Sequence, residues 1–184
     1  MDKSGLKKNM SIIENHLNQN NIILSDSGIE LFETLDLSYC QLLESVDGIA
    51  NLPNLTSLDL KECQSLESVD GLANLPNLTT LDLSQCNIKN IDGLAKLTSL
   101  TELHLDYCTA LKNIDGLANL MNLKELTIAG GCPLDDLNAL VNLPNLTILF
   151  LEGMESFYFD LEGHDLDMYD RQTVSDFQEF IKIL

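Results

Sequence analysis

Leucines recur along the chain in pairs of the form Leu-x-Leu, and successive pairs are 22 or 23 residues apart. In an extended strand successive side chains point to opposite faces, so both leucines of a pair face one side and the residue between them faces the other. One such unit cannot bury its own apolar edge, whereas stacked units share a continuous core. The pattern therefore predicts a solenoid with one short parallel strand per repeat. The six pairs begin at Leu35, Leu58, Leu81, Leu103, Leu126 and Leu149, and in the fifth Ile128 takes the place of the second leucine.

The second half of each repeat carries leucines three residues apart, as at Leu72, Leu75 and Leu78. This spacing is typical of a 3₁₀ turn with its apolar edge directed inward. Four of these arms begin with an Asp-Gly pair, and we expect the carboxylate to cap the arm and the glycine to permit the turn. Because the pairs recur at the structural period without companion ligands, this role is favoured over a metal or phosphate loop. The pairs are Asp47-Gly48, Asp70-Gly71, Asp92-Gly93 and Asp115-Gly116.

One complete repeat reads Leu58-Asp-Leu60-Lys-Glu-Cys63 and continues through Leu66 into Val69-Asp70-Gly71-Leu72. This order resembles the leucine-rich repeat family, in its SDS22-like and bacterial internalin-like subclass, over residues 29–157. The resemblance implies an α/β solenoid that forms a right-handed arc, with a six-stranded parallel sheet on the concave face, 3₁₀ or short helical arms on the convex face and helical caps at both ends. It also implies that partners bind the concave face. Because the motif residues are structural, they define the fold and leave the partner undefined.

The chain is expected to form one structural domain in three parts. These are an N-terminal capping helix and turn over residues 1–30, leucine-rich repeats over 31–151, and an acidic loop with a C-terminal capping helix over 152–184. Within the acidic loop, Asp165 and Asp167 invite comparison with a calcium loop. Tyr169 and Asp170 occupy the places of the third ligand and the glycine, and Asp176 stands where the final glutamate is expected. A solvated loop is therefore predicted.

Both ends of an open solenoid expose core and need elements with a polar outer face. Ser4 is the candidate N-cap of the first helix, and Thr173 or Ser175 is the candidate N-cap of the last. We expect the apolar stripe of each helix to pack on the adjacent end repeat. The alternative for the C-terminal helix is that its stripe docks into a groove of a partner protein. The stripes are formed by Leu6, Met10, Ile13 and Leu17 and by Phe177, Phe180, Ile181 and Leu184.

Four cysteines occupy one position in successive repeats, five residues after the first leucine of each pair, namely Cys40, Cys63, Cys86 and Cys108. The position faces inward, where a thiol packs as a small hydrophobe and donates weakly to a carbonyl. In the fifth repeat Cys132 lies one residue after this position, so we expect its side chain to be partly exposed. We expect an ordinary cysteine of a turn, and the alternative is a reactive thiol. The chain lacks Cys-x-x-Cys, which argues against a zinc site. The distance between neighbouring strands would permit disulfides. The odd number of cysteines and the expected intracellular compartment instead favour five reduced thiols.

Acidic residues dominate the charge, with 29 Asp and Glu against 10 Lys and Arg and a formal net charge of −19. Phosphate binding needs clustered Lys and Arg, so the charge excludes nucleic acid and anionic membrane as partners and favours a protein with a basic surface. No stretch approaches the ~18 apolar residues of a membrane span. The first ten residues lack the apolar segment of a secretory signal. We therefore expect a cytoplasmic protein, monomeric when alone; the alternative is export to a host cell by a route without a cleaved N-terminal signal.

Solvent-facing positions of the predicted strands form columns across the concave face, and carboxylates dominate them. Three aspartates in one column repel one another, a cost that a basic partner relieves and that a solvated surface also tolerates. We predict protein–protein recognition by an adaptor, scaffold or regulatory subunit, with no cofactor and no metal. The predicted binding residues are Asp36, Tyr39, Asp59, Lys61, Glu62, Asp82, Glu102, His104, Asp106, Tyr107, Glu125 and Phe150.

Two other functions stay open from the sequence. A bacterial effector acting inside a host cell would use the same concave face. His104 lies beside Asp82, Asp106 and Glu102 in the predicted sheet, and such a cluster is compatible with the acid–base chemistry of a small hydrolase that uses His104 with Asp82 or Asp106. The chain lacks the usual nucleophile, zinc-protease and phosphate-binding motifs, and a sheet surface has no water-excluding pocket. We therefore predict that the protein is not an enzyme.

Overall fold

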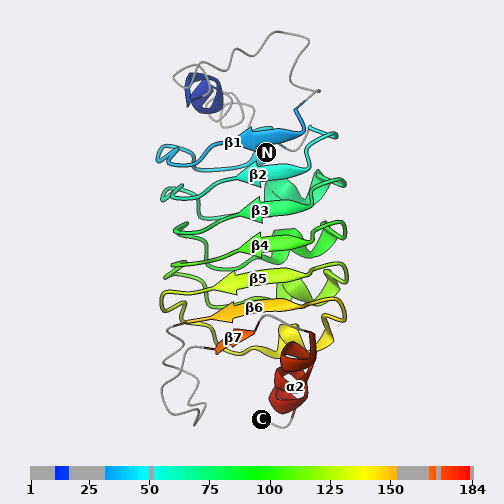
Figure 1. The fold of residues 1–184 in the computed structure, drawn as a ribbon. Helices are drawn as coiled ribbons and strands as arrows, with labels where there is room; N and C mark the ends of the chain where they lie inside the picture. The colour runs from blue at the N-terminus through cyan, green and yellow to red at the C-terminus, as the bar shows by residue number, and fades with distance from the viewer. Residues whose placement is uncertain (1–10, 17–31, 50–51, 153–165, 169–170, 183–184) are drawn as a thin grey trace.

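The computed structural model describes residues 11–16, 32–49, 52–152, 166–168 and 171–182. Seven strands form one sheet in chain order, and the 3₁₀ arms stack behind it (Figure 1). The strands are β1 (Thr34–Asp36), β2 (Ser57–Asp59), β3 (Thr80–Asp82), β4 (Glu102–His104), β5 (Glu125–Ile128), β6 (Ile148–Leu151) and β7 (Leu166–Met168). The arms are η2 (Asp47–Ile49), η3 (Asp70–Asn74), η4 (Asp92–Lys96), η5 (Asp115–Asn119) and η6 (Asn138–Asn142), and helix α2 spans Arg171–Ile181.

The first six strands are parallel and hold the register that the leucine period predicts. Leu35 pairs with Leu58, Leu58 with Leu81, and the series continues to Leu149. The predicted leucine-rich repeat arc with a six-stranded parallel sheet is confirmed. The seventh strand was not predicted: β7 pairs antiparallel with β6, inside the segment expected to be only a loop.

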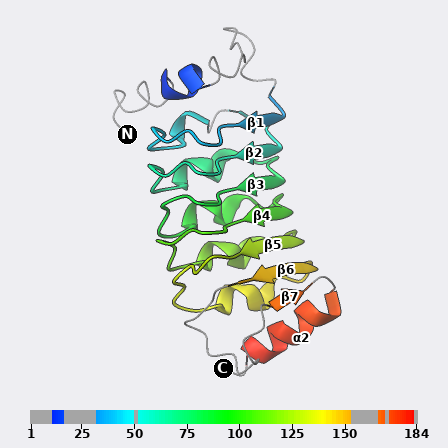
Figure 2. The same ribbon diagram turned by 60° about the vertical axis from the view of Figure 1, so that its left-hand side comes forward.

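The core runs as one continuous cluster between the sheet and the 3₁₀ arms. Both leucines of a strand are fully or almost fully buried, as are the leucines of the arms that face them. Figure 2 shows the strands on one edge of the stack and the arms on the other, with every repeat in the same orientation. Each rung therefore buries its apolar edge only against its neighbours, which is the arrangement that makes a repeat stable in a stack and not alone.

The arms begin differently from the prediction. The residue at the N-cap position is Val69, Ile91 or Ile114, and none of the three makes a side-chain capping hydrogen bond. Instead the backbone N–H of the first arm residue donates to a side-chain oxygen two residues earlier. The expected capping by the aspartates is therefore wrong, because each aspartate enters this turn through its backbone N–H, and where its carboxylate accepts, at Asp47 and Asp115, the donor is a side chain and not the backbone of the arm. The accepting side chains are Ser45, Ser68, Asn90, Asn113 and Asp136.

The glycines of the arms also have another role than predicted. Positive φ angles among the described glycines occur only at Gly130 and Gly131, so the Asp-Gly turns do not need the left-handed region. A Cβ atom on Gly116 would lie 2.1 Å from the carbonyl oxygen of Ile91, and one on Gly93 would lie 2.6 Å from the Cα atom of Asp70. Glycine is needed there because the backbones of neighbouring arms approach too closely for any side chain.

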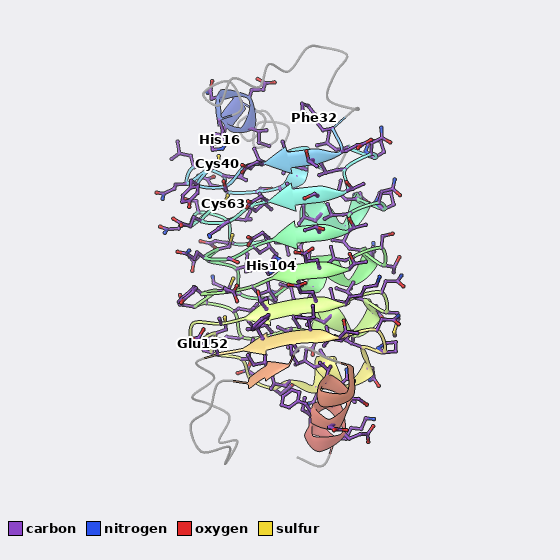
Figure 3. All side chains as sticks on the ribbon, viewed as in Figure 1. His16, Phe32, Cys40, Cys63, His104 and Glu152 are labelled. Atoms are coloured by element: carbon purple, nitrogen blue, oxygen red, sulfur yellow. The ribbon has the colours of Figure 1, made fainter. Side chains whose placement is uncertain are left out.

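The cysteines form a ladder of weak hydrogen bonds between rungs. The Sγ atom of Cys63 donates to the carbonyl of Leu37 at 3.2 Å, and the same contact recurs one rung further at each of the next three cysteines. Figure 3 shows Cys40 and Cys63 one above the other beyond the ends of their strands. All five thiols are free and buried. The expected partial exposure of Cys132 is wrong: it is 3% exposed, because it also donates to the carbonyl of the previous rung.

Burial determines how these thiols should react. Desolvation raises the pKa of Cys63 and Cys108 to about 12 and that of Cys132 to about 11. We expect all five thiols to react slowly with a disulfide reagent in the native protein and rapidly in urea. Above pH 9 the unfolded chain releases these protons while the native state keeps them, so stability should fall between pH ~9 and ~12. One thiol that reacts rapidly in the native protein would contradict the ladder.

The two ends of the stack carry helical elements. Residues 11–16 are helical and Ile13 is buried in the core cluster, as expected for part of an N-terminal cap. The other predicted N-terminal cap residues lie outside the described residues, namely Ser4, Leu6, Met10 and Leu17. No helix in the described part of the chain is long and apolar enough to cross a membrane.

Helix α2 covers the last repeat. Its side chains Val174, Phe177 and Ile181 are buried, so this stripe packs on the solenoid. The side-chain amide of Gln178 donates to the carbonyls of Leu140 and Leu143 at 2.6 and 3.1 Å, so it supplements the long backbone hydrogen bonds at the C-terminal end of η6 and ties the helix to it. The helix begins at Arg171, before both predicted N-cap residues, Thr173 and Ser175, so that expectation is wrong.

Candidate binding face

The concave face is the solvent-facing side of strands β1 to β6 and of the residues that directly follow them. Asp36, Asp59 and Asp82 pair in register on β1, β2 and β3, so the predicted aspartate column exists. The column continues through His104, Thr127 and Phe150 on the next strands. The predicted columns on this face contain eight carboxylates and a single lysine, Lys61. The carboxylates belong to Asp36, Asp59, Glu62, Asp82, Glu102, Asp106, Glu125 and Glu152.

Each column aspartate is fixed by a backbone hydrogen bond. The N–H two residues further on donates to one carboxylate oxygen, from Ser38 at 2.9 Å and from Lys61 and Ser84 at 2.8 Å. This turn leads into a residue with left-handed φ, found at Tyr39, Glu62, Gln85 and Tyr107. The sequence reasoning placed these aspartates on the surface but missed their role in turning the chain. One oxygen of each carboxylate therefore serves the fold.

The two predicted aromatic anchors are exposed. Tyr39 is 58% exposed and Tyr107 is 54% exposed. The ring of Tyr107 lies over Gly130, where a Cβ atom would come within 2.2 Å of the ring atom Cδ1. The tyrosine ring therefore fills the space that a side chain in the next rung would occupy. Phe150, at the C-terminal end of the face, is half-buried on β6.

Neighbouring carboxylates on the face have unequal environments. Hydrogen bonds from the Ser38 side chain and backbone hold the pKa of Asp36 below its usual value. Desolvation raises the pKa of Asp59, and repulsion from Asp82 and Asp36 adds to the rise. The fold therefore disfavours the ionised form of Asp59 and favours the ionised form of Asp36.

We expect Asp59→Asn to raise the melting temperature at pH 7, because it removes a charge that the fold disfavours while its amide oxygen can still accept from Lys61. Asp36→Asn is the matched control and should lower the melting temperature, because that carboxylate has a lowered pKa in the native state. Thermal unfolding followed by circular dichroism measures both. As the pH falls below 3.8 the stabilisation by Asp59→Asn should vanish, since the wild-type carboxylate is then protonated in both states. If both variants shifted the melting temperature in the same direction, the opposite environments assigned to Asp59 and Asp36 would be contradicted.

His104 is held in a chain of side-chain contacts. Its Nδ1 atom lies 3.1 Å from the hydroxyl of Thr127, and its Nε2 atom lies 2.9 Å from a carboxylate oxygen of Glu102. The Thr127 hydroxyl donates to Asp106 at 2.8 Å. The hydrolase interpretation placed Asp82, Asp106 and Glu102 beside the imidazole. Of these, Glu102 contacts it directly, Asp106 reaches it only through Thr127, and Asp82 makes no hydrogen bond to it. Thr127 was missed as a site residue, although the repeat period places it in the His104 column.

Glu125 completes this part of the face. It pairs in register with Glu102 on the neighbouring strand, and both carboxylates lie on the same side of the sheet as His104. Figure 3 shows His104 near the middle of the stack, on the side of the strands that faces the viewer. The centre of the concave face therefore combines a hydrogen-bonded imidazole with carboxylates from two adjacent rungs.

Two family models match the chain. One describes leucine-rich repeats in two copies and matches residues 76–119, and the other describes Zer-1-like leucine-rich repeats and matches residues 27–92. No curated protein matches the chain by sequence.

Solved structures extend the comparison to the fold. The chain is 29% identical to an internalin (inlF) of Listeria monocytogenes, with a TM-score of 0.61, covering 66% of this chain and 35% of that one. It is 35% identical to the internalin C2 (inlC2) of the same organism, with a TM-score of 0.51, covering 57% of this chain and 45% of that one. The leucine-rich repeat domain of the type III effector XopL is 21% identical, with a TM-score of 0.53, covering 81% of this chain and 66% of that one. The chain thus spans less than half of both internalins, and the likeness to XopL is one of fold alone.

Proposed function

Because the chain is a leucine-rich repeat protein of the internalin-like kind, we propose that its concave face binds a protein partner with a basic surface and that the protein acts as an adaptor, scaffold or regulatory subunit. Leucine-rich repeats generally serve protein interaction and not catalysis. The observation that carries the proposal is the column of Asp36, Asp59 and Asp82 in register on adjacent parallel strands.

Electrostatics supports a basic partner. Carboxylates on strands about 4.8 Å apart repel by roughly 1 kcal/mol per neighbouring pair in bulk water, and by about 3.5 kcal/mol at an effective dielectric near 20. The raised pKa of Asp59 has this repulsion among its causes. A lysine or arginine of a partner placed between the carboxylates would relieve the repulsion and speed association at low salt. Tyr39 and Tyr107, both exposed, supply apolar contact area beside the charges.

The test is affinity capture from cell lysate with Asp59→Lys/Asp82→Lys. We expect the wild-type chain to retain a partner at low salt and to lose it at high salt, and the double variant to lose it at both. The matched control is Asp70→Lys/Asp92→Lys, which makes the same charge change at exposed positions of η3 and η4 on the convex side. Equal loss in both double variants would show that net charge matters and the concave face does not. Unchanged capture by Asp59→Lys/Asp82→Lys would refute the proposal.

A second candidate is an effector that acts inside a host cell through the same face. It is favoured by the likeness to internalins of Listeria monocytogenes, with the leucine-rich repeat domain of the type III effector XopL as a further neighbour in fold alone. The same variants distinguish it when capture is repeated from bacterial and from eukaryotic lysates. An effector should retain a partner that depends on Asp59 and Asp82 only from the eukaryotic lysate, whereas an adaptor of the producing cell should retain one from the bacterial lysate.

A further inference from the structure

We propose that Glu102, His104 and Glu125 form a binding site for a divalent transition-metal ion of the zinc type at the centre of the concave face. The candidate ligand atoms of the three side chains lie within 4.8 Å of one another. They come from adjacent strands, with Glu102 and His104 on β4 and Glu125 on β5. No metal was expected from the sequence, in which His104 and Glu125 form no recognisable ligand motif.

The imidazole is oriented for this role by residues outside the ligand set. The hydroxyl proton of Thr127 is committed to Asp106, at 2.8 Å, so its oxygen is left to accept from Nδ1–H of His104, at 3.1 Å. Nδ1 thereby carries a proton, and Nε2 is directed at the carboxylates, where a bound ion would replace the proton that Nε2 shares with Glu102. A metal-binding histidine usually donates its second N–H to a carboxylate or another acceptor, which fixes the ring and the tautomer. Here Thr127 and Asp106 supply that support.

The two glutamates provide the other ligands. Glu102 already lies 2.9 Å from Nε2, and Glu125 stands beside Glu102 in the register of β4 and β5. Two carboxylates side by side repel, and a doubly charged cation between them removes that cost. Tetrahedral zinc with bonds of about 2.0–2.2 Å needs ligand atoms about 3.3 Å apart, a distance that small rotations of the glutamates can reach.

The ligand chemistry selects the class of ion. One imidazole nitrogen and two carboxylate oxygens suit Zn²⁺ and its first-row neighbours, whereas Ca²⁺ and Mg²⁺ prefer ligand sets made only of oxygen. Three protein ligands leave a fourth position for water or for a group of a bound partner. The side chains of Glu102 and His104 are 39% and 22% exposed, so this position opens toward solvent on the concave face. This inference does not rest on the proposed basic partner, because the aspartate column that carries that proposal lies on β1 to β3, whereas the three ligand residues lie on β4 and β5.

The experiment is calorimetric titration of the full chain with Zn²⁺ alone under reducing conditions. We expect one ion per chain, at least a hundredfold weaker binding by His104→Gln, and about tenfold weaker binding by Thr127→Val, which removes the acceptor of Nδ1–H together with its hydrogen bond to Asp106 and leaves the three ligands in place. Glu62→Gln is the matched control, because it neutralises a carboxylate on the same face two rungs away and should leave the affinity unchanged. Mg²⁺ and Ca²⁺ should bind far more weakly than Zn²⁺.

Two further outcomes keep the proposal separate from metal capture by the cysteines. Co²⁺ bound at the predicted site should show no sulfur-to-metal charge-transfer band, because all its ligands are nitrogen and oxygen. A sulfur band would assign the ion to the thiols and overturn the proposal. Absence of Zn²⁺ binding at micromolar concentration, or equal affinity in wild type and His104→Gln, would also overturn it. Circular dichroism of each variant checks that the repeats remain folded.

Discussion

Replacing Gly116 by alanine is expected to lower the free energy of unfolding by about 3 kcal/mol. The new Cβ atom would lie 2.1 Å from the carbonyl oxygen and 2.7 Å from the carbonyl carbon of Ile91. Both contacts are with backbone, so no rotation of a side chain can relieve them and the arms η4 and η5 must separate. That separation would open the core between two central rungs, where the leucines are fully buried.

Urea unfolding of a graded series measures this effect. A Cβ atom on Gly93 would lie 2.6 Å from the Cα atom of Asp70. One on Gly71 would lie 2.8 Å from a side-chain oxygen of Asp47, which can move, and 2.9 Å from the backbone N and Cα atoms of Asp47, which are longer than the shortest backbone contacts at Gly93 and Gly116. Destabilisation should therefore decrease in the order Gly116→Ala, Gly93→Ala, Gly71→Ala. Alanine normally stabilises a turn by lowering the entropy of the unfolded chain, by about 0.4–1 kcal/mol where the backbone tolerates it. A stabilised Gly116→Ala variant would mean that the glycines serve the turn and not the approach of the arms.

Introducing a charge into the C-terminal cap is the second large expected effect, and Val174→Asp should cost about 4 kcal/mol or more. Val174 is fully buried where α2 packs against η6 and β6. An aspartate there would lie in the apolar stripe of the helix without a partner. The helix would then detach, uncovering the apolar end of the last repeat and breaking the hydrogen bonds from Gln178 to the carbonyls of Leu140 and Leu143.

Thermal unfolding and size-exclusion chromatography test the cap. Val174→Asp should melt at a lower temperature and self-associate through the uncovered end, as expected when a solenoid loses its cap. Ser175→Ala is the matched control on the exposed side of the same helix, and it should melt like the wild type. A Val174→Asp variant with unchanged melting but lost partner binding would show that α2 is a docking helix, in contradiction to its buried stripe.

The repeat pattern predicted the fold well because it encodes burial. Leu58 and Leu60 alternate with Asp59, and that alternation alone places the leucines inside and the aspartate outside. The concave columns followed from the same period, so the alignment of Asp36, Asp59 and Asp82 was predictable. The antiparallel β7 was not, since residues 166–168 carry no repeat signal and their pairing depends on the exposed edge of β6.

The sequence by itself therefore determined the period of the rungs, the residues that form the core and the residues that face solvent. Only the tertiary structure decided what each residue contacts in the next rung. Gly116 is required by the backbone of Ile91, His104 is oriented by Thr127, and Cys132 is buried by its bond to the carbonyl of Leu105. A hydrophobic period specifies the side of a repeat on which a residue lies. These contacts join residues about 23 positions apart in the chain, and a change of a few tenths of an ångström in their separation makes or breaks them, so the period alone does not define them.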